Sequence, residues 1–71
     1  MSDWTPDPDF VEFLQAIVDY MKNPDDKAIG EAVMQEINSG SEIGEEMYDA
    51  FYTNPAMQLI YEDWKQDKDN P

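Results

Sequence analysis

The chain has 71 residues, with 17 Asp or Glu, four Lys and no Arg, which gives a formal net charge of −13 at pH 7. This charge excludes ordinary nucleic-acid binding, which depends on cationic contacts to phosphate, and it argues against docking on anionic membranes. Cys and His are absent, so disulfides, thiolate metal sites and the commonest catalytic nucleophiles and bases are excluded as well.

Hydrophobic residues make up 41% of the chain, and their helical spacing predicts a folded all-α protein rather than a disordered one. We expect one domain over residues 1–71, a compact bundle of four short helices arranged around the first, with a lead-in (1–6) and a tail (67–71) that fray. No apolar run approaches the roughly 18 residues of a membrane span. The acidic N-terminus lacks the apolar segment of a signal peptide, so we expect a soluble cytoplasmic protein.

The most apolar stretch runs from Asp9 to Lys22 and is predicted to be the first and central helix. Thr5 or Asp7 can cap it, and Trp4 is expected to fold back onto it. On a helical wheel its polar residues leave an apolar arc of about 200°, whereas a surface helix needs only about 100°. Cover from several sides is therefore expected, with part of the arc left exposed. The arc comprises Phe10, Val11, Phe13, Leu14, Ile17, Val18, Tyr20 and Met21.

Three further helices are predicted from Asn or Ser caps and from Pro at the first helical position. They span residues 24–38, 39 or 41 to 53, and 55–66. Gly30 is expected to mark a close approach to the first helix, and Gly40 suits a left-handed helix end. The residues predicted to face inward are Ile29, Val33, Met34 and Ile37 in the second helix, Ile43, Met47, Ala50 and Phe51 in the third, and Met57, Ile60, Tyr61 and Trp64 in the fourth.

The third predicted helix carries the most ordered acidic feature of the chain. Its four carboxylates occupy positions i, i+3, i+4 and i+7 and so form one stripe. At 1.5 Å per residue they extend over about 10.5 Å, or about 3.5 Å per charge, close to the 3.4 Å spacing of charges along one DNA strand. We call this set the acidic row; it consists of Glu42, Glu45, Glu46 and Asp49.

Two tyrosines, Tyr48 and Tyr52, flank the acidic row between core and solvent. Tyrosine at the edge of a charged stripe is typical of protein-contact hot spots. It is equally typical of a helix that completes its core with an amphipathic side chain. A second acidic contact row is predicted at Asp25, Asp26, Glu31 and Glu36.

No catalytic or metal-binding motif is present. The Ser residues lie in helix caps or near the terminus, and the three Gly form neither a P-loop nor a dinucleotide-binding pattern. The Asp-x-Asp pairs at 7–9 and 67–69 lack the turn Gly and the distal Glu of an EF-hand loop. We therefore expect no enzymatic activity, no cofactor and no dedicated metal site.

The acidity itself indicates a function class. A small domain needs a net charge of only about 2 to 8 for solubility, so we expect a partner that uses the surplus: a basic, nucleic-acid-binding surface of another protein. The plainer alternative is a solvated face without a partner. In size, acidity and lack of catalytic residues the chain resembles the small inhibitors that phages use against host defence, including anti-CRISPR and anti-restriction proteins. The resemblance implies a DNA-mimicking inhibitor in the host cytoplasm.

Two other classes stay open. The wide apolar arc of the first helix fits an assembly or accessory protein that forms a homodimer, so both monomer and homodimer are expected states. The chain is also similar to acyl carrier proteins in length, acidity and four-helix architecture. That similarity implies a phosphopantetheine on Ser41, although Gly40 and Glu42 replace the Asp and Leu of the family's Asp-Ser-Leu signature.

Overall fold

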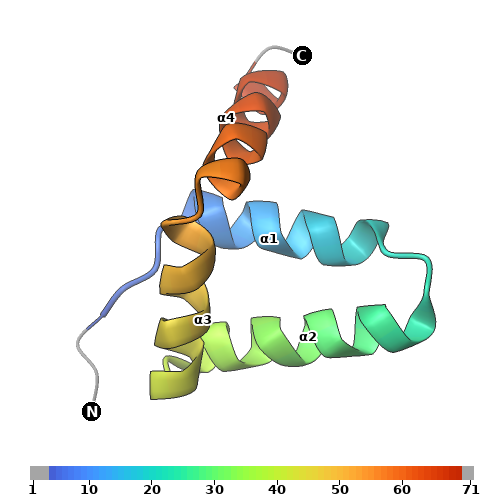
Figure 1. The fold of residues 1–71 in the computed structure, drawn as a ribbon, viewed down its shortest axis with the longest axis vertical. Coiled ribbons are helices and arrows are strands. Elements are labelled where there is room, and N and C mark those ends of the chain that lie inside the picture. Colours follow the sequence, from blue (N-terminus) through green and yellow to red (C-terminus); the bar gives the residue numbers. More distant parts are fainter. Residues whose placement is uncertain (1–3, 70–71) are drawn as a thin grey trace.

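The computed structural model describes residues 4–69, which form four α-helices and contain no strand. They are α1 (Pro8–Tyr20), α2 (Pro24–Ser39), α3 (Glu42–Tyr52) and α4 (Pro55–Asp69). Helices α1 and α2 lie side by side as an antiparallel pair, α3 crosses one end of this pair, and α4 continues from α3 past α1 (Figure 1). The predicted compact all-α domain of four helices is confirmed. None of the helices within residues 4–69 is long and apolar enough to cross a membrane.

Side-chain caps determine where the four helices begin. In each case an oxygen of the residue before the helix accepts a hydrogen bond, 2.9 to 3.0 Å long, from a backbone N–H in the first turn. Such a cap satisfies a donor that has no partner within the helix. The four caps are Asp7, Asn23, Ser41 and Asn54.

Both ends of the described chain contact the rest of the fold, at Trp4 as predicted and at α4 beyond the predicted end of the helix. Trp4 packs against the core, with its ring centroid 5.4 Å from that of Tyr48. At the other end α4 continues to Asp69, three residues beyond the predicted end at Gln66. In this last turn Lys68 Nζ lies 2.6 Å from Glu12 Oε2, so an ion pair links the end of α4 to α1. Residues 1–3 and 70–71, the other parts of the predicted lead-in and tail, lie outside the described residues.

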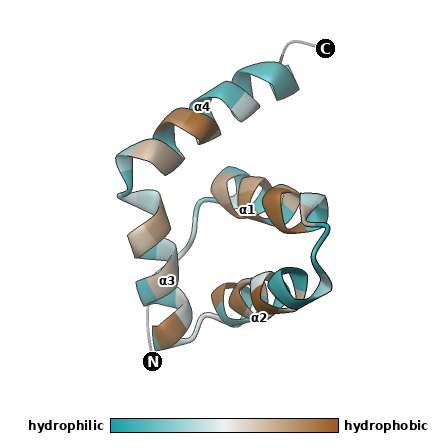
Figure 2. Cartoon of the chain, turned by 45° about the vertical axis from the view of Figure 1, so that its right-hand side comes forward, coloured by the Kyte–Doolittle hydropathy of each residue, from teal (hydrophilic) through white to brown (hydrophobic). Residues whose placement is uncertain are grey.

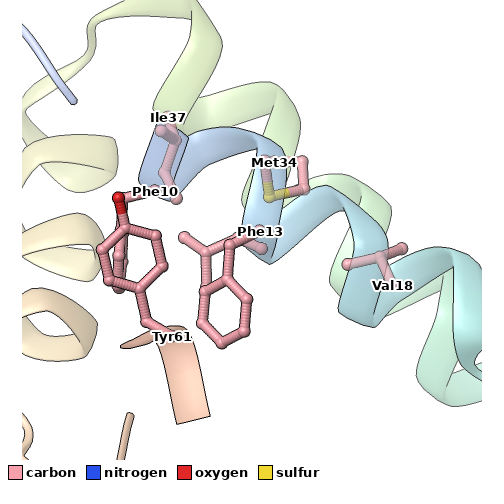
Figure 3. Packing of buried hydrophobic residues seen from close by; sticks show 7 residues of the cluster. Phe10, Phe13, Val18, Met34, Ile37 and Tyr61 are labelled. Carbon is pink, nitrogen blue, oxygen red and sulfur yellow. The ribbon is translucent and has the colours of Figure 1, made fainter. Parts of the chain in front are cut away.

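Helix α1 supplies the centre of the core, as predicted. Phe10 and Phe13 are almost completely buried, and their rings lie 5.0 and 5.3 Å from the ring of Tyr61 on α4 (Figure 3). Ring pairs at this separation and angle add to the stabilisation from burial. The buried core of the described residues comprises Phe10, Phe13, Leu14 and Val18 of α1, Met34 and Ile37 of α2, and Tyr61 of α4.

Several residues predicted to face inward are exposed. Tyr20 is 87% exposed, Ile29 66% and Ile60 53%; on α3, Ile43 is 56% exposed and Ala50 is exposed as well. These positions are apolar on the helical wheel, but three short helices do not cover them all. Because α3 and α4 pack near the beginning of α1, the far end of the α1–α2 pair has no third helix over it (Figure 1).

Gly44, which had no predicted role, faces α2 in place of Ile43. A Cβ atom added at Gly44 would collide with the carbonyl oxygen of Glu36 and would lie 2.8 Å from the backbone nitrogen of Ile37. Both are backbone atoms and cannot rotate away. The absence of a side chain at this position therefore lets α3 cross directly on the last turns of α2.

The two glycine roles predicted from the sequence are confirmed. A Cβ atom at Gly30 would lie 2.9 Å from Cγ2 of Val18, so α2 approaches α1 closely at this point. Gly40 ends α2 with a φ angle of 75°, in the left-handed region that favours glycine.

Candidate interaction surface

The acidic row lies on the outward side of α3. Gly44 marks the side that contacts α2, and at 100° per residue the centre of the row lies about 150° away from it. Glu42, Glu46 and Asp49 are exposed, and Glu45 is half-buried. The structure thus brings the four predicted carboxylates onto one face, held in place by the close packing of α3 on α2.

The cations of the chain lie on other helices or loops. Helix α3 contains no Lys. Lys65 Nζ lies 3.9 Å from Asp9 Oδ2, and Lys68 pairs with Glu12, so both lysines of α4 balance carboxylates of α1. The charge of the acidic row is therefore not offset by any lysine on its own helix.

Tyr48 contacts other parts of the fold through both its hydroxyl group and its ring. Its Oη accepts a hydrogen bond from the backbone N–H of Asp7 at 2.8 Å, and its ring meets that of Phe10 edge-on at 5.5 Å. Burial raises the pKa of the Tyr48 phenol above its usual value, although the hydrogen bond from Asp7 acts in the opposite direction. These contacts are those of an amphipathic core residue, one of the two interpretations of the sequence; contact with a partner stays a prediction.

Tyr52 is the more accessible of the two tyrosines. It is 38% exposed and stacks on Tyr48, with 5.4 Å between ring centroids and an interplanar angle of 22°. Its backbone carbonyl accepts a hydrogen bond from Gln58 Nε2. Because Tyr52 borders the acidic row and keeps part of its ring in solvent, it stays a predicted partner contact.

The second predicted acidic row is spread along the length of α2. Asp25 and Asp26 are exposed in the first turn of α2, and Glu31 is exposed further along. Glu36 is half-buried, and its Oε2 accepts a hydrogen bond from Ser41 Oγ at 2.7 Å. At 1.5 Å per residue, Asp26 and Glu36 are separated by about 15 Å along the helix. Glu36 is thus engaged in the α2–α3 junction, and contact of this second row with a partner stays a prediction.

Ser41, the candidate attachment site of the carrier alternative, is engaged in the same junction. Its hydroxyl donates to Glu36 and accepts from the backbone N–H of Gly44 at 3.0 Å. Ser41 is also half-buried. This side chain serves as a helix cap that joins two helices.

A surface that the site predictions missed lies on the α1–α2 pair. It is an open groove of about 680 Å³, lined almost entirely by apolar side chains of all four helices, and we call it the apolar groove. Figure 2 shows hydrophobic stretches on α1, on α2 and on the first half of α4. The apolar arc of the first helix was the signal, since it was predicted to stay partly exposed. Residues that line the groove include Ile17, Val18, Ile29, Val33, Met57 and Ile60.

Comparison with family models, with curated proteins and with solved structures found no match to this chain. Within residues 4–69, no group of three or more Asp or Glu side chains is placed to hold a metal ion. We base the inferences below on the acidic row and on the apolar groove.

Proposed function

We propose that this protein is an inhibitor that binds another protein and occupies its basic, nucleic-acid-binding surface with the acidic row. The observation that carries the proposal is the outward face of α3, where four carboxylates share one side of a helix without a lysine. A row of negative charge with an average spacing of about 3.5 Å along the helix resembles a segment of nucleic-acid backbone. A surface evolved to bind phosphates would accept it for the same electrostatic reason.

The charge of the whole molecule favours this mode of binding. A net charge of −13 on 71 residues creates a long-range field that steers a positively charged partner toward the protein. Complementary charge of this kind raises the association rate and the specificity more than it raises the final affinity. By analogy of size and charge, we propose a phage protein of the anti-CRISPR or anti-restriction type that acts in the host cytoplasm.

The first test measures binding to purified CRISPR and restriction complexes as a function of salt. Raising NaCl from about 50 to about 500 mM shortens the screening length from roughly 14 to roughly 4 Å. We expect the association rate to fall steeply over this range. An affinity and a rate that stay constant with salt would refute the electrostatic proposal.

The second test asks whether the row itself makes the contact. We expect Glu42→Lys with Glu46→Lys to slow association by about tenfold to a hundredfold, because both side chains are exposed members of the row. A matched control, Glu62→Lys with Asp69→Lys, changes the net charge equally on α4, where both residues are exposed. An equal decrease of the association rate in the two double variants would show that only the net charge matters. An unchanged association rate in both would show that the acidic row does not make the contact.

A further inference from the structure

The apolar groove has features of a docking surface for a macromolecule. Its floor is formed by side chains of the α1–α2 pair, such as Leu14 and Met34, which are buried. Its edges are formed by Ile29 of α2 and Ile60 of α4, each more than half exposed. Large aliphatic side chains in water are costly, at about 25 cal/mol per Å² of apolar area. Exposed apolar edges around an apolar floor mark a surface that gains stability when it is covered.

The exposed apolar edges of the groove favour a helix over a small molecule as its occupant. A second hollow of about 340 Å³ adjoins the groove and shares Ile17 and Ile60 with it. This hollow is edged by Tyr20, which is 87% exposed, and by Trp64. A small ligand inside either hollow would leave these edges in water. An α-helix, about 10 to 12 Å wide with its side chains, would cover the apolar groove together with its exposed edges at Ile29 and Ile60.

The charged residues around the groove indicate which chemical class of partner it would bind. Asp26 lines the groove, Asp63 and Asp67 line the adjoining hollow, and no lysine lines either one. The two lysines of α4 are directed to Asp9 and Glu12 on α1. A second copy of this chain would bring another 13 negative charges to the same place. We therefore propose that the apolar groove binds an amphipathic helix of a basic protein, with Lys or Arg of that helix facing Asp26 at the side of the groove.

This surface is separate from the acidic row. Phe51 lines the groove, and on the helical wheel it lies on the opposite side of α3 from the row. The inference therefore goes beyond the proposed inhibitory function and does not depend on it. A protein with both surfaces can hold a basic partner at two points.

The test uses a synthetic peptide as the probe. It has about 18 residues, enough to form a helix, with Leu at i, i+3, i+4 and i+7 spacing and Lys elsewhere. A shuffled peptide of the same composition tests whether the amphipathic order of the residues matters beyond attraction between opposite charges. A peptide with Glu in place of Lys tests whether the positive charge of the partner matters. Fluorescence anisotropy gives the affinities. We expect the amphipathic Lys peptide to bind at least about tenfold more tightly than either control.

Variants of the full chain locate the binding site. Ile29→Gln and Ile60→Gln each remove an apolar side chain from the edge of the groove and replace it with a residue that also favours helix. We expect each variant to abolish the preference for the amphipathic peptide. The matched control is Leu59→Gln, which is 70% exposed on α4 and lines neither hollow; it should leave the preference intact. Circular dichroism checks that each variant is folded.

Three results would overturn the inference. Equal affinity for the shuffled and amphipathic peptides would mean that only surface charge binds them. Equal affinity for the Glu peptide would contradict the basic partner. A dimer in sedimentation that Ile60→Gln dissociates would show that a second copy occupies the groove. The variant Glu42→Lys with Glu46→Lys should keep the peptide preference, so failure here is distinguishable from failure of the proposed inhibitory function.

Discussion

Asp7 and Tyr48, which are 41 residues apart in the chain, are joined by a hydrogen bond of 2.8 Å from the backbone N–H of Asp7 to Tyr48 Oη. This bond ties the beginning of α1 to the middle of α3. Tyr61 provides a contrast, because its hydroxyl is buried and has no hydrogen-bond partner among the described residues. The same functional group is thus satisfied in one tyrosine and unsatisfied in the other.

Removing the two hydroxyl groups should have opposite effects on stability. Tyr48→Phe leaves the Asp7 N–H without its partner, and we expect it to lower the free energy of unfolding by about 1 kcal/mol. Tyr61→Phe removes an unsatisfied polar atom from the core, so we expect stability to stay equal or to rise. Urea denaturation followed by circular dichroism measures both. A larger loss for Tyr61→Phe than for Tyr48→Phe would contradict the hydrogen-bond assignment.

The glycine contacts predict which helix junction tolerates a side chain. Gly44→Ala places a methyl group against the backbone of α2, and we expect a loss of at least about 1 to 3 kcal/mol. Gly30→Ala meets the side chains of Val18 and Met21 rather than backbone atoms, and the gain of about 1 kcal/mol in helix propensity offsets part of the strain, so we expect a smaller loss. Thermal melting of the two variants compares them directly. Equal melting temperatures would show that the α2–α3 contact is looser than described.

The sequence predicted the helices well because their signals are local. Asn23 and Asn54 cap the helices that they were expected to cap, and Gly40 ends α2 as predicted. The role of Gly44 could not be predicted, since it depends on which backbone crosses α3. The contact between Lys68 and Glu12 could not be predicted either, since the two residues are 56 positions apart in the chain.

The acidic row could be read from spacing alone, whereas the apolar groove could not. Residues four apart on one helix share a face regardless of tertiary structure, so the relation of Glu42 to Glu46 follows from the sequence. The exposure of Ile29 and Ile60 depends on where α3 and α4 end relative to α1. That arrangement is set by long-range packing, which a helical wheel does not contain.

Stability should fall at high pH because of Tyr48 and Tyr61. Burial raises the pKa of both phenols, so the folded state favours their neutral form. The unfolded state releases these protons first, near pH 10. Stability is therefore fully present below about pH 10 and falls as the pH rises from there through the raised pKa values. The hydrogen bond to Glu12 raises the pKa of Lys68, which adds a loss in the same direction.

Phenylalanine variants separate these contributions. We expect the loss of stability between about pH 10 and pH 11.5 to be smaller in the double variant Tyr48→Phe with Tyr61→Phe. The dependence of stability on pH that remains in this double variant then reports on lysine, and Lys68→Gln should reduce it. Denaturant titrations at each pH give the free energy of unfolding. An unchanged slope in the tyrosine double variant would contradict the assignment to buried phenols.

Added salt should stabilise this protein, and Asp49 should account for part of the effect. Like charges four residues apart on a helix cost about 0.2 to 0.5 kcal/mol, and Asp49 follows Glu45 at this spacing. The positive N-terminal end of α3 offsets the charge of Glu42 and Glu45 in the first turn, but it does not reach Asp49. We therefore expect Asp49→Asn to raise the free energy of unfolding by a few tenths of a kcal/mol at low salt. Near 1 M NaCl the screening length is about 3 Å, so the substitution should have no effect there. Chemical denaturation of both proteins at the two salt concentrations measures this difference; stabilisation that persists in high salt would point to helix propensity rather than to repulsion within the row.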